Sequence, residues 1–116
     1  MIAPGINLTG FITHKNTDTR SCDEEAIKKC REFIREYCTT RKTINRKFSS
    51  YFLKHVCEKV IGDYVSNGDF IQAAILEGYR VEPIEDTFSG NINIRVKREV
   101  IDQYCAHSWV SSNGWY

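Results

Sequence analysis

The stretch YVSNGDFIQAAILEGY, from Tyr64 to Tyr79, carries the clearest fold signal in the chain. The hydroxyl of Ser66 can cap a helix, Asp69 stands favourably in the first turn, and Gly78 is suited to ending it. The side chains at helical spacing that we expect to face the core are Phe70, Ile71, Ala74 and Ile75. The sequence therefore predicts a helix over residues 67–77.

Two further helices are predicted before this stretch. Ser49 and Ser50 can cap a helix over 50–61 that ends at Gly62, and its apolar stripe comprises Leu53, Val56, Cys57, Val60 and Ile61. Ser21 and Glu24 fit a capping box for a helix over 22–38, and its apolar stripe comprises Ala26, Ile27, Cys30, Phe33, Ile34, Tyr37 and Cys38. Residues 39–48 have no sustained period and are predicted to form a connector, partly helical at most.

After Gly78 the apolar period changes to two. Tyr79 and Val81 alternate with polar residues, as do Ile92, Ile94 and Val96 after a turn-rich segment, which predicts a β-hairpin with a loop of about six residues. Pro83 must lie at an end or edge of this hairpin. A short helix is predicted within 98–107, and a short edge strand within 6–12.

The predicted fold class is α+β: a three-helix core with a C-terminal β-hairpin, similar to a winged helix-turn-helix, plus a short C-terminal helix or tail. A composition of 41% hydrophobic and 27% charged residues over 116 positions is ordinary for one domain. We expect a single domain over 1–116, with an N-terminal arm (1–20), a body (21–107) and an aromatic tail (108–116). The sequence has no long apolar run and no signal-peptide layout, which predicts a cytoplasmic protein without a membrane span.

The order helix, turn, helix, hairpin raises the question of whether 67–77 reads DNA. In this prediction its outward face consists of Asp69, Gln72, Ala73 and Leu76, flanked by Glu77. A face with acids and no bases is repelled by phosphates, so we expect no insertion into the major groove. Such a face suits a protein partner better.

Charge is uneven along the chain although the net charge is only +1. The candidate basic patch comprises Arg41, Lys42, Arg46, Lys47, Tyr51 and Lys54. The candidate acidic side comprises Asp63, Asp69, Gln72, Leu76, Glu77, Glu82, Glu85 and Asp86. Three interpretations of the basic segment stay open: a solvated connector with Phe48 and Tyr51 in the core, a protein-binding patch, and a patch for nucleic acid.

No catalytic residue, metal site or cofactor is predicted, because no catalytic or phosphate-binding motif occurs in the sequence. Two alternatives remain. Cys57, Cys105 and His107 offer the ligand types of a zinc site, and a cysteine nucleophile could meet a histidine through space.

The segment SSYFLKHVCEKVIGDYVSNGDFIQAAILEGYRV, residues 49–81, resembles small proteins of bacteriophages and related mobile elements. The motif SSYxLKH followed by YVSNGxFIxAAxxxGY carries this resemblance, together with NINI at 91–94. The resemblance covers under half of the chain. It implies a bacterial host cytoplasm and a size typical of inhibitors of host defence such as anti-CRISPR proteins.

Two functional hypotheses follow. The first is a non-enzymatic mobile-element protein that blocks a host nucleic-acid-processing complex by binding a protein or ribonucleoprotein through its acidic or its basic side. The second is a winged-helix protein that binds DNA or RNA, using the basic connector and the hairpin residues Arg95, Lys97 and Arg98 on phosphates. The oligomeric state is not predicted.

Overall fold

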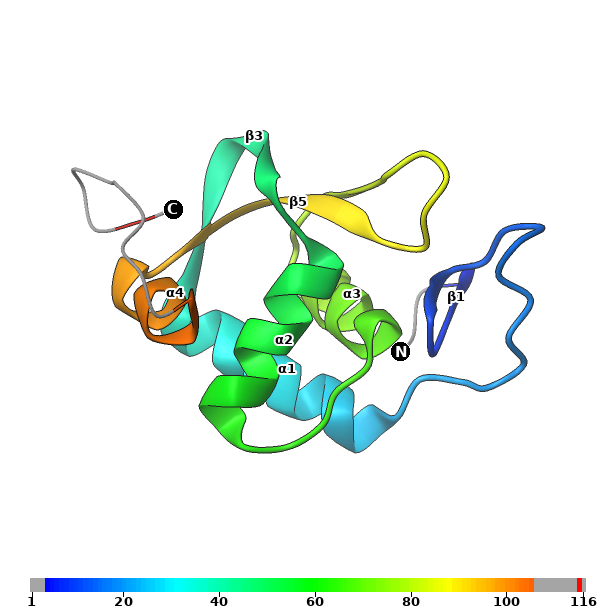
Figure 1. The fold of residues 1–116 in the computed structure, drawn as a ribbon, viewed down its shortest axis with the longest axis horizontal. Helices are drawn as coiled ribbons and strands as arrows, with labels where there is room; N and C mark the ends of the chain where they lie inside the picture. The colour runs from blue at the N-terminus through cyan, green and yellow to red at the C-terminus, as the bar shows by residue number, and fades with distance from the viewer. Residues whose placement is uncertain (1–3, 106–114, 116) are drawn as a thin grey trace.

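The computed structural model describes residues 4–105 and Trp115, and these residues have an α+β fold. Within these residues lie four helices, a three-stranded antiparallel sheet and a separate two-stranded hairpin. In chain order the elements are β1 (Ile6–Asn7), β2 (Gly10–Phe11), α1 (Glu24–Tyr37), β3 (Cys38–Ser49), α2 (Ser50–Ile61), α3 (Asn67–Leu76), β4 (Val81–Pro83), β5 (Gly90–Val96) and α4 (Arg98–Cys105). Figure 1 shows the sheet across the top of the molecule with α1, α2 and α3 beneath it.

Helix α1 keeps its predicted apolar stripe but begins later than expected. The predicted capping box of Ser21 and Glu24 is wrong, because the carboxylate of Asp23 accepts the hydrogen bond from the backbone N–H of Ala26 at 3.2 Å. Asp is as good a cap as Ser. The N–H of Asp23 also donates to Asp69 of α3 at 2.9 Å, so a tertiary contact helps to decide where α1 begins.

Helix α2 and the β4–β5 hairpin agree with the sequence prediction. Ser49 caps α2, and Gly62 ends it in a left-handed conformation with φ 77°. Ile92, Ile94 and Val96 are fully buried, and Pro83 is the last residue of the edge strand β4. Local periodicity and capping were sufficient signals for both elements.

Strand β3 was missed, because the segment 39–48 was predicted to be a connector. It pairs antiparallel with β5, which lies between β3 and β4 in the sheet. The ladder shifts register between Thr40 and Asn45, where the buried amide of Asn45 donates to the carbonyl of Ile94 at 3.0 Å. Interrupted pairing breaks the two-residue alternation that identifies a strand, so only the β-branched content of this segment favoured the correct assignment.

Helix α3 is the buried centre of the molecule. All residues from Asn67 to Ala74 are buried, because α1, α2, β1, β2 and β4 all contact this helix. The predicted exposure of Asp69, Gln72 and Ala73 is therefore wrong: their side chains are 0–1% exposed. Apart from Gln72, only apolar residues occur between Asp69 and Glu77, and a helix that is apolar all round belongs in a core.

Polar side chains at the starts of α2 and α3 form what we call the buried polar junction: Ser50, Ser66, Asn67 and Asp69. Ser66 and Asp69 make a reciprocal capping box, and the hydroxyl of Ser50 donates to Asn67 at 2.7 Å while accepting the N–H of Gly90. The Asn67 amide donates to the carbonyl of Thr9. The junction thus ties α2, α3, β5 and the N-terminal arm together, and its serines and asparagine belong to the segment 49–81.

The N-terminal arm forms the β1–β2 hairpin where a single edge strand was predicted. Gly68 of α3 donates its N–H to the carbonyl of Leu8, and a Cβ atom at this position would collide with the carbonyl oxygen of Asn7. Glycine therefore permits the close approach of the arm to the helix.

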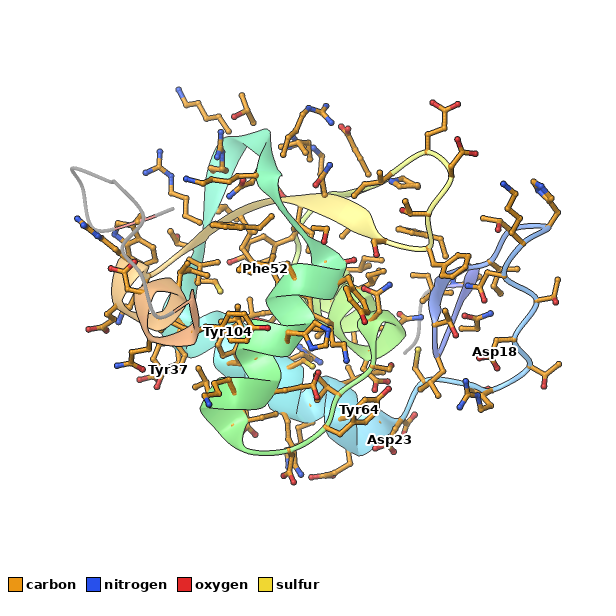
Figure 2. All side chains as sticks on the ribbon, in the orientation of Figure 1. Asp18, Asp23, Tyr37, Phe52, Tyr64 and Tyr104 are labelled. Carbon is orange, nitrogen blue, oxygen red and sulfur yellow. The ribbon has the colours of Figure 1, made fainter. Side chains whose placement is uncertain are left out.

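Helix α4 confirms the predicted C-terminal helix. Val100 and Ile101 are buried, and Tyr104 lies edge-on to Phe52 of α2 with ring centroids 5.5 Å apart (Figure 2). The predicted aromatic tail, residues 108–116, lies outside the described residues except for Trp115. Among the helices described, none combines the length and apolar character required to span a membrane.

Candidate binding surface

Helix α3 is not positioned to contact the bases of DNA. We expected α3 to be excluded from a groove by its acidic outer face, but it is excluded because the protein itself buries it. In addition, β5 forms the centre of a three-stranded sheet and does not project as a wing. The described residues therefore do not confirm the winged helix-turn-helix arrangement.

The predicted acidic residues do not form one side of the molecule. Asp69 and Gln72 are buried, and Leu76 is partly buried against the core. Glu77 lies at the end of α3 between two α1 arginines, at 2.6 Å from Arg31 and 2.9 Å from Arg35.

The other four acids point to separate places. Asp63 follows α2 and pairs with Lys29 at 2.7 Å, whereas Glu82 lies on β4 and pairs with Arg46 at 3.2 Å. Glu85 and Asp86 are exposed in the loop between β4 and β5. A single acidic interface over these residues is therefore not supported.

The predicted basic patch divides into two groups. Arg41, Lys42, Arg46 and Lys47 lie on β3, whereas Tyr51 and Lys54 lie on α2. Lys54 was wrongly expected to be exposed: its side chain is 8% exposed, and its ammonium lies 2.7 Å from Glu58.

The ammonium of Lys54 also lies over the rings of Tyr51 and Tyr64, at 5.5 Å and 4.9 Å from their centroids. Tyr64 follows α2 (Figure 2). Lys54 is therefore an internal cation rather than a phosphate ligand. Phe48 is in the core, as one interpretation required, but Tyr51 is 54% exposed.

Folding brings two further arginines to the basic residues of β3. Arg95 pairs with Thr39 in the β3–β5 ladder and alternates with the buried Ile94 and Val96, which places Arg95 on the face of the sheet opposite the core. The guanidinium of Arg80 donates to the carbonyl of Lys42 at 3.4 Å. We call the resulting surface the basic sheet face, and it comprises Arg41, Lys42, Arg46, Arg80 and Arg95.

Asn93 of β5 holds the strands of this face together. Its side-chain oxygen accepts the N–H of Arg80 at 2.7 Å, and its side-chain amide donates to the carbonyl of Arg41 at 3.3 Å. Side chains with nitrogen at their tips surround β3 in Figure 2. Sequence reasoning joined Arg95 to the basic connector only in the winged-helix hypothesis and gave Arg80 no role, because the non-local pairing of β3 with β5 is what brings them beside residues 41–46.

The cations of this face are mostly unopposed by acids. Arg46 pairs with Glu82, but within the part of the chain that the structure describes no carboxylate lies within 4.0 Å of Arg41, Lys42, Arg80 or Arg95. Like charges gathered on one face repel one another, and this repulsion opposes folding. The arrangement leaves these cations free to bind an anion.

The described cysteines do not resemble reactive thiols. Cys22, Cys30, Cys38 and Cys57 are free, and Cys30 and Cys57 are fully buried in the core. Burial raises the pKa of Cys22 to about 12 and that of Cys38 well above its usual value. Such thiols stay protonated at neutral pH and are poor nucleophiles.

The described residues contain no group of three or more metal-ligating side chains. The zinc alternative depended on Cys105 and His107, and neither side chain is among the described residues.

No protein-family model matches the chain, and neither the curated proteins nor the solved structures include a significant match. The functional argument therefore depends on the surface itself.

Proposed function

We propose that this protein is a non-enzymatic binding protein of a mobile element that binds nucleic acid through its basic sheet face. Acting in the cytoplasm of a bacterial host, it blocks a host nucleic-acid-processing defence complex by occupying the nucleic acid of that complex. The observation that carries the proposal is the group of four cations, Arg41, Lys42, Arg80 and Arg95, that have no carboxylate partner among the described residues.

The spacing of these cations supports a polyanion rather than a single small anion. They come from β3, from β5 and from the position directly before β4, and neighbouring strands of a sheet lie about 4.8 Å apart. A nucleic-acid backbone presents phosphates in a row at comparable spacing, so one strand can contact several of these cations. A winged helix is not required for this mode, because the sheet rather than a helix contacts the phosphates.

The arrangement of the acids gives less support to an inhibitor that binds through the candidate acidic side. The candidate acids are buried, ion-paired or dispersed over separate elements, whereas the cations are exposed or half-exposed on one face. The raised pKa of Cys22 and Cys38 supports the non-enzymatic part of the proposal.

Fluorescence anisotropy with labelled DNA and RNA oligonucleotides tests the binding. We expect the logarithm of the binding constant to fall linearly with the logarithm of the salt concentration, by about 0.7 for each phosphate contacted on a single strand. The double variant Arg41→Ala/Arg95→Ala removes two such contacts and should make the slope shallower by about 1.4.

The matched control is Lys28→Ala/Lys59→Ala, which removes two exposed cations from α1 and α2 and should leave the slope unchanged. Circular dichroism confirms that both variants fold. Absence of binding at roughly 50 mM salt, or an equal slope in both double variants, would refute the proposal.

A pull-down from bacterial lysate, with and without nuclease, tests the blocking role. We expect a host complex to be retained by the wild type and lost after nuclease treatment or in Arg41→Ala/Arg95→Ala. Tight nucleic-acid binding without any recovered protein partner would refute the proposed blocking role. Retention of a partner after nuclease treatment would instead indicate direct contact with a host protein.

A further inference from the structure

The basic sheet face is hollowed where β3 leaves the ladder. Arg41, Lys42 and Arg95 line this hollow, which has a volume of about 660 Å³, together with Thr39, Thr40, Thr43 and Trp115. Pockets for small molecules and cofactors have volumes of roughly 300–1,000 Å³, so the hollow has room for a nucleotide. Its lining combines cations, hydroxyls and an indole ring.

The polar lining is suited to a phosphate group. The guanidinium of Arg41 is held by the hydroxyl of Thr43, with donor–acceptor distances of 2.9 and 3.3 Å from Nη2 and Nε. Arg95 enters the hollow from β5, opposite Thr39 on β3. Two guanidinium groups and neighbouring hydroxyls are the donors that commonly bind phosphate oxygens in proteins.

Trp115 adds an element that a phosphate alone does not need. Its backbone bridges to Lys97 directly after β5, and its half-buried side chain lines this hollow and a neighbouring one over Lys97 and α4. Proteins that bind single strands combine cations that follow the backbone with aromatic rings on which bases stack. A duplex does not offer free base faces, because its bases are stacked on each other.

We propose that the hollow binds one nucleotide of a single-stranded nucleic acid, with its phosphate held by Arg41 and Arg95 and its base stacked on Trp115. This inference rests on the proposed function, and it specifies single strands as the class of nucleic acid that the face selects. Because stacking does not depend on base identity, little sequence preference is expected.

Tryptophan fluorescence tests the stacking directly. The chain has two tryptophans, so the variant Trp109→Phe leaves Trp115 as the sole indole. Single-stranded oligonucleotides should quench this fluorescence. An abasic oligonucleotide of the same length should bind through its phosphates without the same quenching.

Affinity measurements separate the base from the phosphate. Trp115→Ala should weaken single-strand binding roughly 10-fold and leave the salt slope unchanged, whereas Trp115→Phe should retain most of the affinity. Arg41→Ala/Arg95→Ala should reduce the salt slope. The wild type should bind a single strand more tightly than a duplex of the same length.

Three outcomes would overturn the inference. Equal affinity for single strand and duplex with no quenching would overturn the nucleotide site and leave the proposed nucleic-acid binding intact. An acidic polypeptide such as polyglutamate that binds as tightly as the oligonucleotide, with Trp115→Ala having no effect, would identify a protein-type partner. Absence of binding to any oligonucleotide would overturn both proposals.

Discussion

The buried polar junction and the basic sheet face are both rich in hydrogen-bonding groups, but the two regions satisfy them in opposite ways. In the junction, Asp69 is 1% exposed and accepts the N–H groups of Ser66 and Asp23, each at 2.9 Å. On the sheet face, Arg41 and Arg95 stand on one surface with no carboxylate in ion-pair range among the described residues.

The difference separates polar residues that make the fold from polar residues that are available to a ligand. A buried donor or acceptor must be satisfied by the protein, so the loss of its partner destabilises the fold. An exposed cation is satisfied by water, so its removal should change binding and leave stability almost unaffected. Substitutions in the buried polar junction should therefore lower the free energy of unfolding. Substitutions on the basic sheet face should instead weaken binding.

The largest effect on stability is expected for Asp69→Ala. The change leaves two backbone N–H groups without their acceptor and should lower the free energy of unfolding by about 2–4 kcal/mol. Urea denaturation measures this, and Asp69→Asn, which keeps one acceptor oxygen, should lose less. Asp63→Ala is the matched control: it breaks an exposed pair with Lys29 and should cost below about 1 kcal/mol. Equal losses in the two alanine variants would remove the distinction between the regions.

Gly68→Ala should have the next largest effect. The new methyl group collides with the backbone of the arm at Asn7, and overpacking of this kind costs about 1–3 kcal/mol. Hydrogen exchange should show weaker protection at Gly10 and Phe11, because the arm must move away from α3. An unchanged urea midpoint would mean that the arm does not pack tightly on the helix.

The pair of ion bridges at Glu77 should make stability depend on pH. Burial alone raises the pKa of Glu77, but hydrogen bonds from Arg35 and Arg31 outweigh it and hold the pKa below its ordinary value of 4.5. The stabilisation is therefore complete above pH 4.5 and is lost as the pH falls through the lower pKa of the folded state. Thermal unfolding of Glu77→Gln between neutral and acidic pH should show a shallower loss than the wild type. Parallel curves would show that Glu77 contributes nothing to the acid sensitivity.

The smallest effect on stability is expected for Arg95→Ala, within about 0.5 kcal/mol of the wild type, because the guanidinium has no carboxylate partner among the described residues. The same variant should weaken nucleic-acid binding measurably in the anisotropy titration. A loss of stability comparable to that of Asp69→Ala would place Arg95 among the residues that make the fold.

Local signals predicted the elements whose ends and faces depend on nearby residues. Ser49 and Gly62 bound α2 as predicted, and the alternation of Ile92, Ile94 and Val96 identified β5 with its buried face. A helix cap is made within one turn and a strand face within a few residues, so the sequence contains the whole interaction.

The basic sheet face could be predicted only in part. Arg41, Lys42 and Arg46 were identified as a basic segment, but Arg80 and Arg95 join them only through pairing of β3 with β5 and β4. The irregular ladder at Asn45 concealed the strand that makes this pairing. Lys54 was assigned to the same patch because it is close in sequence, although it lies on α2 and is buried beside Glu58.

The sequence by itself determined the helices α1, α2 and α3, the hairpin β4–β5 and the uneven distribution of charge, because each depends on residues within a few positions of one another. Only the tertiary structure decided that α3 is buried from Asn67 to Ala74 and that cations of β3, of β5 and of the position before β4 share one face. The physical reason is that burial and surface charge depend on non-local contacts, which periodicity along the chain does not encode.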